Sequence, residues 1–294
     1  MLLNVVHETH YSYSSPVVLS QQMMHLAPRA LDWQNCYEHR LCIEPEPGEL
    51  GEGVDFFGNR TARMLIAAPH GDLLVRAVSS VSVAPREQRA LALPQTAWEE
   101  VRDRVREPRD GALAEAAGFL YESPHVETSR ELAGYAAQSF ARGRGALEAA
   151  LDLTRRIYAD FKFDKTATSV STPLREVMKR RRGVCQDFAH LLIGSLRSLG
   201  LPARYVSGYL LTEPPPGRPR LVGADASHAW GAVYCGEAAG WVDLDPTNNC
   251  VVDDEHVTLG WGRDFGDVTP MRGVILGGGE QELDVHVTVT PLES

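Results

Sequence analysis

The chain has 294 residues, of which 44% are hydrophobic and 23% are charged, and its formal net charge is −10 at pH 7. This ordinary globular composition excludes a disordered chain, a collagen-like repeat and a coiled coil, and the length suggests two domains at ~150 residues each. The negative charge disfavours nucleic acid and anionic membranes as partners. No apolar run approaches the ~18–20 residues of a membrane span, so we expect no membrane partner either.

The N-terminus and the cysteines indicate the compartment. Residues 1–4 lack a basic flank, and Glu8 follows too soon for a signal peptide. The five cysteines are an odd number without a C-x-x-C pair, which disfavours a complete disulfide framework and an all-cysteine zinc site. We therefore predict a cytoplasmic protein with reduced thiols.

Residues 1–86 have the period of β-strands. Leu3, Val5, Tyr11 and Tyr13 share one parity, as a strand with one buried face requires, and residues 75–83 repeat the alternation. Glycines with proline or asparagine neighbours at 46–48 and 58–59 predict turns between apolar stretches. These features predict an antiparallel sheet or a small sandwich.

From about residue 95 to 161 the period is that of helices. One stripe has apolar or partly apolar residues spaced 4, 3, 4 and 3 apart, namely Leu147, Leu151, Thr154, Tyr158 and Phe161. Residues 132–140 predict a helix before it, and a further helix is expected from Cys185 to the stop signal at residues 200–202.

The last third returns to β-strands, predicted at 206–211, 228–234 and 241–245, with a closing half-exposed strand at 283–289. Proline-rich residues 214–217 predict a loop. We therefore divide the chain into an N-terminal β domain, residues 1–90, and residues 91–294. The second part holds a helical segment, an α+β core and the closing strand.

Cys185 is the first candidate for chemistry. It stands where a helix is predicted to begin, and the free N–H groups of a helix N-terminus stabilise a thiolate. Taken alone, the cysteine also fits a small buried apolar residue, which is what most free cysteines are.

A base and a carboxylate follow on two predicted strands. If Tyr234 pairs with Trp241 across the turn at 235–240, Asp245 becomes the diagonal neighbour of His228 on the same face of the sheet. Asp243 lies two residues further along, so this register favours Asp245. His228 alone fits a core histidine, and Asp243 fits a carboxylate at a sheet edge.

Together these side chains form the set that an activated thiol requires. Cys185 is the nucleophile, His228 the base and Asp245 the group that orients the base. The backbone N–H of Cys185 is a candidate donor to an oxyanion. The sequence identifies no second donor.

Four blocks of sequence resemble the bacterial branch of the transglutaminase-like superfamily. They occur in that family's order of Cys, His and Asp, and they are Arg182-Gly183-Val184-Cys185-Gln186-Asp187-Phe188-Ala189-His190, Leu199-Gly200-Leu201-Pro202-Ala203-Arg204-Tyr205, Ser227-His228-Ala229-Trp230 and Gly240-Trp241-Val242-Asp243-Leu244-Asp245-Pro246-Thr247. The resemblance is strongest over about 150–250, and extends more weakly to residues 1–86.

The resemblance implies an α+β fold with a papain-like transglutaminase core, in which the cysteine's helix packs on an antiparallel sheet that carries His and Asp. A β-sheet or sandwich domain is expected before it. It also implies a triad of Cys185, His228 and Asp245. Family members transfer acyl groups from glutamine to amines or hydrolyse amides as thiol peptidases, and some have lost the triad and only bind. No EF-hand-type loop supports a calcium requirement here.

Three more residues are possible site-lining positions. Asp187 is interpreted mainly as a helix cap, although family members often carry a carboxylate there. Trp230 is expected to be core or a wall beside His228, and Asp225 to lie in a loop or line the cleft. The ten histidines show no metal-binding spacing, so we expect no metal and no cofactor.

We therefore predict a cysteine peptidase or amidase that acts on a peptide or protein substrate. One alternative is a protein-glutamine transglutaminase, because the triad does not determine whether water or an amine accepts the acyl group. Another is a peptide-binding module with a vestigial triad. The oligomeric state and the role of the N-terminal domain stay open.

Overall fold

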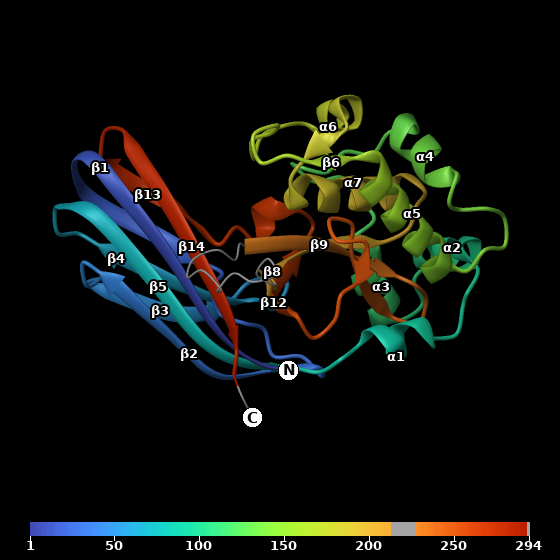
Figure 1. Ribbon diagram of the computed structural model, residues 1–294, viewed down its shortest axis with the longest axis horizontal. Coiled ribbons are helices and arrows are strands. Elements are labelled where there is room, and N and C mark those ends of the chain that lie inside the picture. Colours follow the sequence, from blue (N-terminus) through green and yellow to red (C-terminus); the bar gives the residue numbers. More distant parts are fainter. Residues whose placement is uncertain (213–226, 293–294) are drawn as a thin grey trace, which may run out of the picture.

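The computed structural model describes residues 1–212 and 227–292. Its secondary structure is mixed α+β with two large antiparallel sheets, as predicted. The larger sheet forms the left half of Figure 1, and the helices surround the smaller sheet in the right half. Asp225 and the loop at 214–217 lie outside the described residues.

The larger sheet contains strands from both ends of the chain. Its hydrogen-bonded order is β2-β5-β1-β4-β3, and two C-terminal strands also pair with β1. The bounds are β1 Leu2–Met24, β2 Gln34–Glu44, β3 Glu49–Val54, β4 Arg60–Ile66, β5 His70–Val83, β13 Met271–Gly277 and β14 Gln281–Pro291. Strand β1 pairs with both C-terminal strands: its first half pairs with β14 and its second half with β13.

The smaller sheet carries two of the predicted site residues. Its order is β11-β10-β9-β8-β12. The bounds are β8 Ala203–Leu210, β9 Ser227–Tyr234, β10 Trp241–Asp245, β11 Cys250–Val251 and β12 His256–Gly262, and a separate parallel pair is formed by β6 Lys162–Phe163 and β7 Arg182–Gly183. The predicted pairing of Tyr234 with Trp241 is present.

Helix α7, Cys185–Ser198, is buried at the centre of the second half. It packs on β8 and β9 and is covered by α4, α5 and α6, as Figure 1 shows. The remaining helices are α1 Glu87–Leu91, α2 Trp98–Arg106, α3 Gly111–Ala117, α4 Arg130–Ala137, α5 Ala146–Asp160, α6 Leu174–Arg180 and the short η1 Phe265–Asp267. The helix predicted at 147–161 is present as α5, but its buried face differs from the predicted stripe. Leu147 and Thr154 are buried, together with Leu153 and Ile157, whereas Tyr158 is exposed.

The two sheets meet through an apolar cluster and two amide side chains. The cluster joins residues of β1, β5 and β14 to residues of β8 and β12. Gln34 donates to the Thr258 carbonyl and accepts from the Thr258 N–H, both at 2.7 Å. Asn59 bonds the carbonyl and N–H of Trp261 in the same way, at 2.8 and 2.9 Å. Because β12 is the last strand on its side of the sheet, these amides satisfy backbone groups that an edge strand leaves unpaired.

The two C-terminal strands belong to the larger sheet, which the sequence predicts for the N-terminal domain alone. Residues 271–291 pair with β1 and therefore lie in the larger sheet, although they follow the smaller sheet in sequence. The boundary near residue 90 stays a prediction. The three glycines at 277–279, all with positive φ, make the turn between β13 and β14. Within the described ranges, no helix has the length and apolar character needed to cross a membrane.

Candidate active site

Cys185 is the first residue of α7, as predicted, and its side chain is partly exposed. The helix start is fixed by Asp187, whose Oδ2 accepts from the Val184 N–H at 2.8 Å and from the Thr168 hydroxyl at 2.6 Å. Burial raises the pKa of Asp187, and these two hydrogen bonds oppose that rise. At the first helical position the Cys185 N–H has no intrahelical acceptor, so it is available to a ligand.

Gly183 makes this helix start possible. A Cβ at Gly183 would lie 2.6 Å from Asp187 Oδ2, closer than real contacts allow. The Gly-Val-Cys-Gln-Asp sequence therefore places the capping carboxylate where a side chain on the preceding turn would otherwise stand. Asp187 is nearly completely buried and has the capping contact that the sequence predicts.

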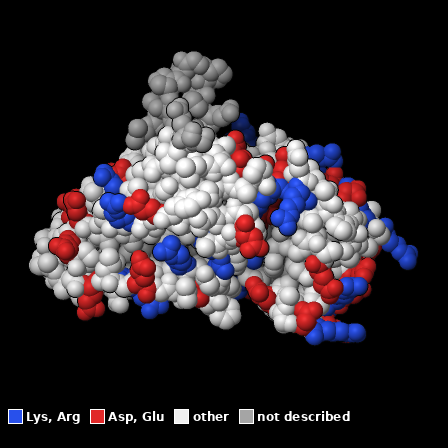
Figure 2. All heavy atoms as spheres, turned by 90° about the horizontal axis from the view of Figure 1, so that it is seen from below, with Lys and Arg blue, Asp and Glu red and all other residues white. Residues whose placement is uncertain are grey.

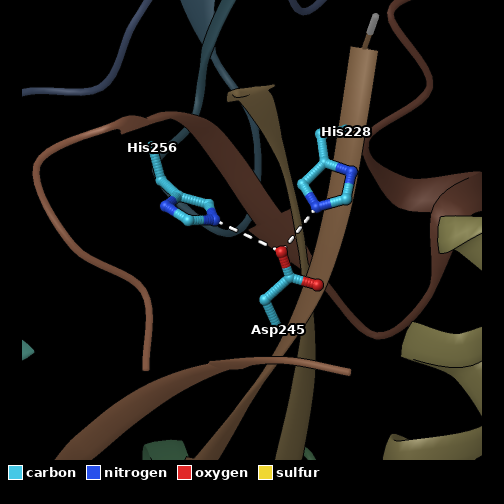
Figure 3. A group of neighbouring side chains, drawn as sticks. All are labelled: His228, Asp245 and His256. Carbon is cyan, nitrogen blue, oxygen red and sulfur yellow. Dashed lines mark hydrogen bonds and ion pairs between the residues drawn. The ribbon is translucent and has the colours of Figure 1, made fainter. Parts of the chain in front are cut away.

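His228 and Asp245 are in hydrogen-bond contact. The imidazole Nε2 lies 2.7 Å from Asp245 Oδ2, as Figure 3 shows. The register explains this contact, because Leu244 pairs with Gly231 and the next residue therefore reaches the histidine diagonally. Asp245 is fully buried and His228 is nearly so.

The Cys185 thiol lies close enough to the same imidazole to act on its pKa. Because Nε2 faces Asp245, we assign the thiol to the Nδ1 side of the ring. Burial lowers the pKa of His228, but the hydrogen bonds and charges of Asp245 and Cys185 outweigh it and raise the pKa to about 10. Burial also acts to raise the pKa of Asp245, yet its bonds to histidine hold that pKa well below the usual range. The raised pKa therefore favours an imidazolium between Cys185 and Asp245 at neutral pH.

The turn after β10 fixes the other carboxylate oxygen. Asp245 Oδ1 accepts from the N–H groups of Thr247 at 2.8 Å and Asn248 at 3.2 Å. Pro246 cannot donate a hydrogen bond, so the Asp-Pro-Thr-Asn sequence turns with the aspartate as its acceptor. The Asn248 side chain also donates to Oδ2, at 2.6 Å.

Comparisons with known proteins agree with this arrangement. A family model described as the bacterial transglutaminase-like N-terminal region matches residues 3–82, and one described as the transglutaminase-like superfamily matches residues 134–246. An uncharacterized protein of Mycobacterium tuberculosis is 39% identical over 295 residues, covering 98% of this chain and 92% of its own. One of Mycobacterium leprae is 30% identical over 293 residues, with 99% of each chain covered. The chain belongs to the transglutaminase-like superfamily.

A solved structure has a similar fold. The crystal structure of a "putative cysteine protease" from Cytophaga hutchinsonii has a TM-score of 0.76 to this chain, at 21% identity, with coverage of 100% of this chain and 91% of that one. The likeness therefore extends over both sheets. Together with the two family-model matches, it confirms the predicted combination of a transglutaminase-like core and a preceding β domain.

The other predicted positions of this transglutaminase-like chain lie as follows. Trp230 is fully buried, with its ring 6.1 Å from that of His228, so it forms a wall beside the histidine. Asp243 is bonded to Arg86, whose Nη1 lies 3.1 Å from Oδ2. The carboxylate at 243 is therefore engaged in an ion pair away from the histidine.

Two residues near Asp245 were not anticipated from the sequence. Asn248 had a signal, since asparagine three residues after a strand-ending aspartate commonly bonds within a turn. His256 had none. It begins β12, three places from β10 in the sheet order, yet its Nε2 lies 3.3 Å from Asp245 Oδ2. The chain segment that joins β10 to β12 is short, since the two residues are 11 positions apart in sequence.

His228, Asp245 and His256 also have the ligand types of a metal site, with their ligand atoms within 4.8 Å of one another. Tetrahedral zinc with bonds of about 2.0–2.2 Å holds its ligands roughly 3.3 Å apart. The 2.7 Å between His228 and Asp245 is shorter and is typical of a charge-assisted hydrogen bond. Asp245 Oδ2 also accepts from Asn248, so we assign these contacts to a hydrogen-bond network.

Proposed function

We propose that this chain is a thiol enzyme that hydrolyses an amide through an acyl-enzyme on Cys185, as a cysteine peptidase or amidase. The observation that carries the proposal is the 2.7 Å hydrogen bond between His228 and Asp245, next to Cys185 at the start of a buried helix. Each of these side chains has a partner that fits its role in acyl transfer.

In the first half-reaction the Cys185 thiolate attacks the substrate carbonyl, and a C–S bond forms. The oxyanion accepts a hydrogen bond from the Cys185 N–H. His228 then gives its Nδ1 proton to the leaving amine as the C–N bond breaks, and a thioester remains. Asp245 keeps Nε2 oriented and stabilises the imidazolium in the resting state.

In the second half-reaction His228, now neutral, takes a proton from water. The hydroxide adds to the thioester, the C–S bond breaks, and the acid leaves while the thiolate and imidazolium are restored. Partial exposure of Cys185 favours water as the acceptor, since solvent reaches the sulfur. A transglutaminase would pass the same acyl group to an amine.

The substrate class follows from the chemistry of the attack, which needs an amide of a peptide or protein. Acidic and basic side chains are interspersed on the face seen in Figure 2, and the net charge of the chain is −10. Both observations disfavour nucleic acid as a partner.

Mass spectrometry of a peptide library incubated with the protein tests the proposal, with and without a small primary amine. We expect Cys185-dependent cleavage or deamidation that the amine does not divert. Amine-tagged glutamines would instead identify a transglutaminase. Cys185→Ala should abolish every product, whereas Cys250→Ala, a change at another partly exposed cysteine, should retain them. No product in any arm would support a binding module with a vestigial triad.

A further inference from the structure

His256 contacts the proposed triad from a side that the triad itself does not use. Figure 3 shows the two imidazoles of His228 and His256 on either side of Asp245, both directed at the same carboxylate oxygen. The distances to Oδ2 are 2.7 Å for His228 and 3.3 Å for His256. Both histidines and the aspartate are buried.

The position of the proton on His256 follows from its surroundings. Nε2 faces the carboxylate, whereas no described residue offers a partner to the buried Nδ1. A proton on Nδ1 would be a buried donor without an acceptor, which is costly. The hydrogen therefore belongs on Nε2, from which it is donated to Asp245.

The surrounding structure holds His256 firmly in place. The side-chain amides of Gln34 and Asn59 bond the backbone of β12 at Thr258 and Trp261. The Trp230 ring packs nearly perpendicular to the His256 ring, with the centroids 5.3 Å apart. An imidazole fixed in this way can restrain the group to which it donates.

The orientation of the Asp245 carboxylate matters because its hydrogen bond orients the His228 ring. A carboxylate can rotate about its broad terminal torsion, and the loss of a buried donor removes one restraint on that rotation. Oδ1 is held by the turn, while Oδ2, which also accepts from Asn248, has to stay aligned with His228. A donor on the far side of Oδ2 opposes rotation away from that alignment.

We propose that His256 is a positioning residue, which donates its Nε2 hydrogen to Asp245 and keeps that carboxylate aligned with His228. The proposal rests on the proposed function, since it concerns the same thiol–imidazole pair. Its consequence is that His256 promotes formation of the reactive thiolate without touching the substrate.

The test measures the alkylation rate of Cys185 by iodoacetamide as a function of pH, followed by peptide mapping, which requires no knowledge of the substrate. His256→Met removes the donor at similar size, and His256→Gln retains an N–H near the position of Nε2. At pH 6 we expect Cys185 of His256→Met to react about tenfold more slowly than Cys185 of the natural protein. A loss of ion-pair stabilisation equivalent to one pKa unit lowers the thiolate fraction tenfold at this pH. His256→Gln should recover most of that loss.

The pH profile separates positioning from general damage. Above about pH 10 an ordinary thiol with a pKa near 8.5 is ionised without help, so the difference between the variants should disappear there. His25→Met is the matched control, because His25 is also buried and its Nε2 also lies 3.3 Å from a carboxylate, that of Asp55. We expect this control to leave the Cys185 profile unchanged.

Equal rates for His256→Met and the natural protein at pH 6 would overturn the proposal, as would a deficit that persists unchanged at pH 10. If Cys185 of the natural protein reacts no faster at pH 6 than the exposed Cys42, the proposed function fails instead. Should His256→Met not fold, the imidazole ¹⁵N spectrum of the natural protein decides. The Nε2–H tautomer at His256 is expected, and the Nδ1–H tautomer would contradict the proposal.

Discussion

Arg86 forms an ion pair with Asp243, two residues before the aspartate that contacts His228. The Arg86 Nη1 and Asp243 Oδ2 atoms lie 3.1 Å apart, and both side chains are largely buried. Strand β10 thus carries two carboxylates of one parity with different partners, one an arginine and the other a histidine. Asparagine should therefore lower the reaction rate at position 245 and the stability of the fold at position 243.

Asp245→Asn should lower kcat roughly ten- to a hundredfold. The amide keeps the size but weakens the hold on the imidazolium, and a thiolate–imidazolium pair needs less help than a serine, for which the equivalent loss is about 10⁴. Asp243→Asn should leave kcat within about twofold and instead destabilise the fold by about 1–3 kcal/mol, since Arg86 loses its charged partner. Rates and melting temperatures of both variants check this. A large kcat effect at Asp243 with none at Asp245 would contradict the assigned roles.

The His228 pKa predicts how stability varies with pH. Burial lowers this pKa, but bonds to Asp245 and Cys185 raise it to about 10 in the fold, above the ordinary value of 6.5. A raised pKa stabilises the fold fully below pH 6.5, and this contribution is lost as the pH rises from 6.5 through 10. Urea unfolding at pH 6.5 and 9.5 should therefore show a smaller difference between the two pH values for His228→Gln than for the natural protein. An equal difference in both proteins would mean that His228 is not an imidazolium in the fold.

Gly208 leaves the space that the Trp230 ring and the Val257 carbonyl occupy. It pairs with His228 on one side, and a Cβ there would lie 2.2 Å from the Val257 carbonyl and 2.5 Å from the Trp230 ring. Gly208→Ala should cost about 1–3 kcal/mol or more of unfolding free energy, because strand β12 has to move. Gly71→Ala, on a strand where the new Cβ meets nothing within 4 Å, is the control and should change stability by less than about 1 kcal/mol. Similar unfolding midpoints for both variants would refute this packing argument.

Asn59 joins the larger sheet to β12 and should be needed for stability. It is fully buried and bonds the N–H and carbonyl of Trp261. Asn59→Ala leaves both backbone groups without these partners, which should cost about 2–4 kcal/mol in urea unfolding. Asn35→Ala, on the exposed side of β2, should be nearly neutral. A neutral result at Asn59 would show that solvent replaces its bonds readily.

The sequence could predict those parts of the site that depend on residues close together in the chain. Tyr234 and Trp241 flank a short turn, so their register follows from chain proximity and places Asp245 beside His228. The start of α7 at Cys185 follows from the glycine before it and the capping aspartate after it. Such features depend on residues close in sequence.

The features that were missed depend on long-range packing. Strands β13 and β14 return to pair with β1, which lies near the other end of the chain, and alternation alone does not identify a strand's partner. The contact of His256 with Asp245 joins two strands that are not neighbours in the sheet. Pairing of adjacent strands, the basis of the sequence argument, does not reveal such a contact.

The reactivity of Cys185 tests the central claim most directly, because it needs no substrate. Iodoacetamide labelling at pH 6, read by peptide mapping, should modify Cys185 at least about tenfold faster than the exposed Cys42 of the same chain. In His228→Gln the rate at Cys185 should fall to that of Cys42 or below it. Equal labelling of the two cysteines in the natural protein, or an unchanged rate in His228→Gln, would contradict a thiol enzyme activated by His228.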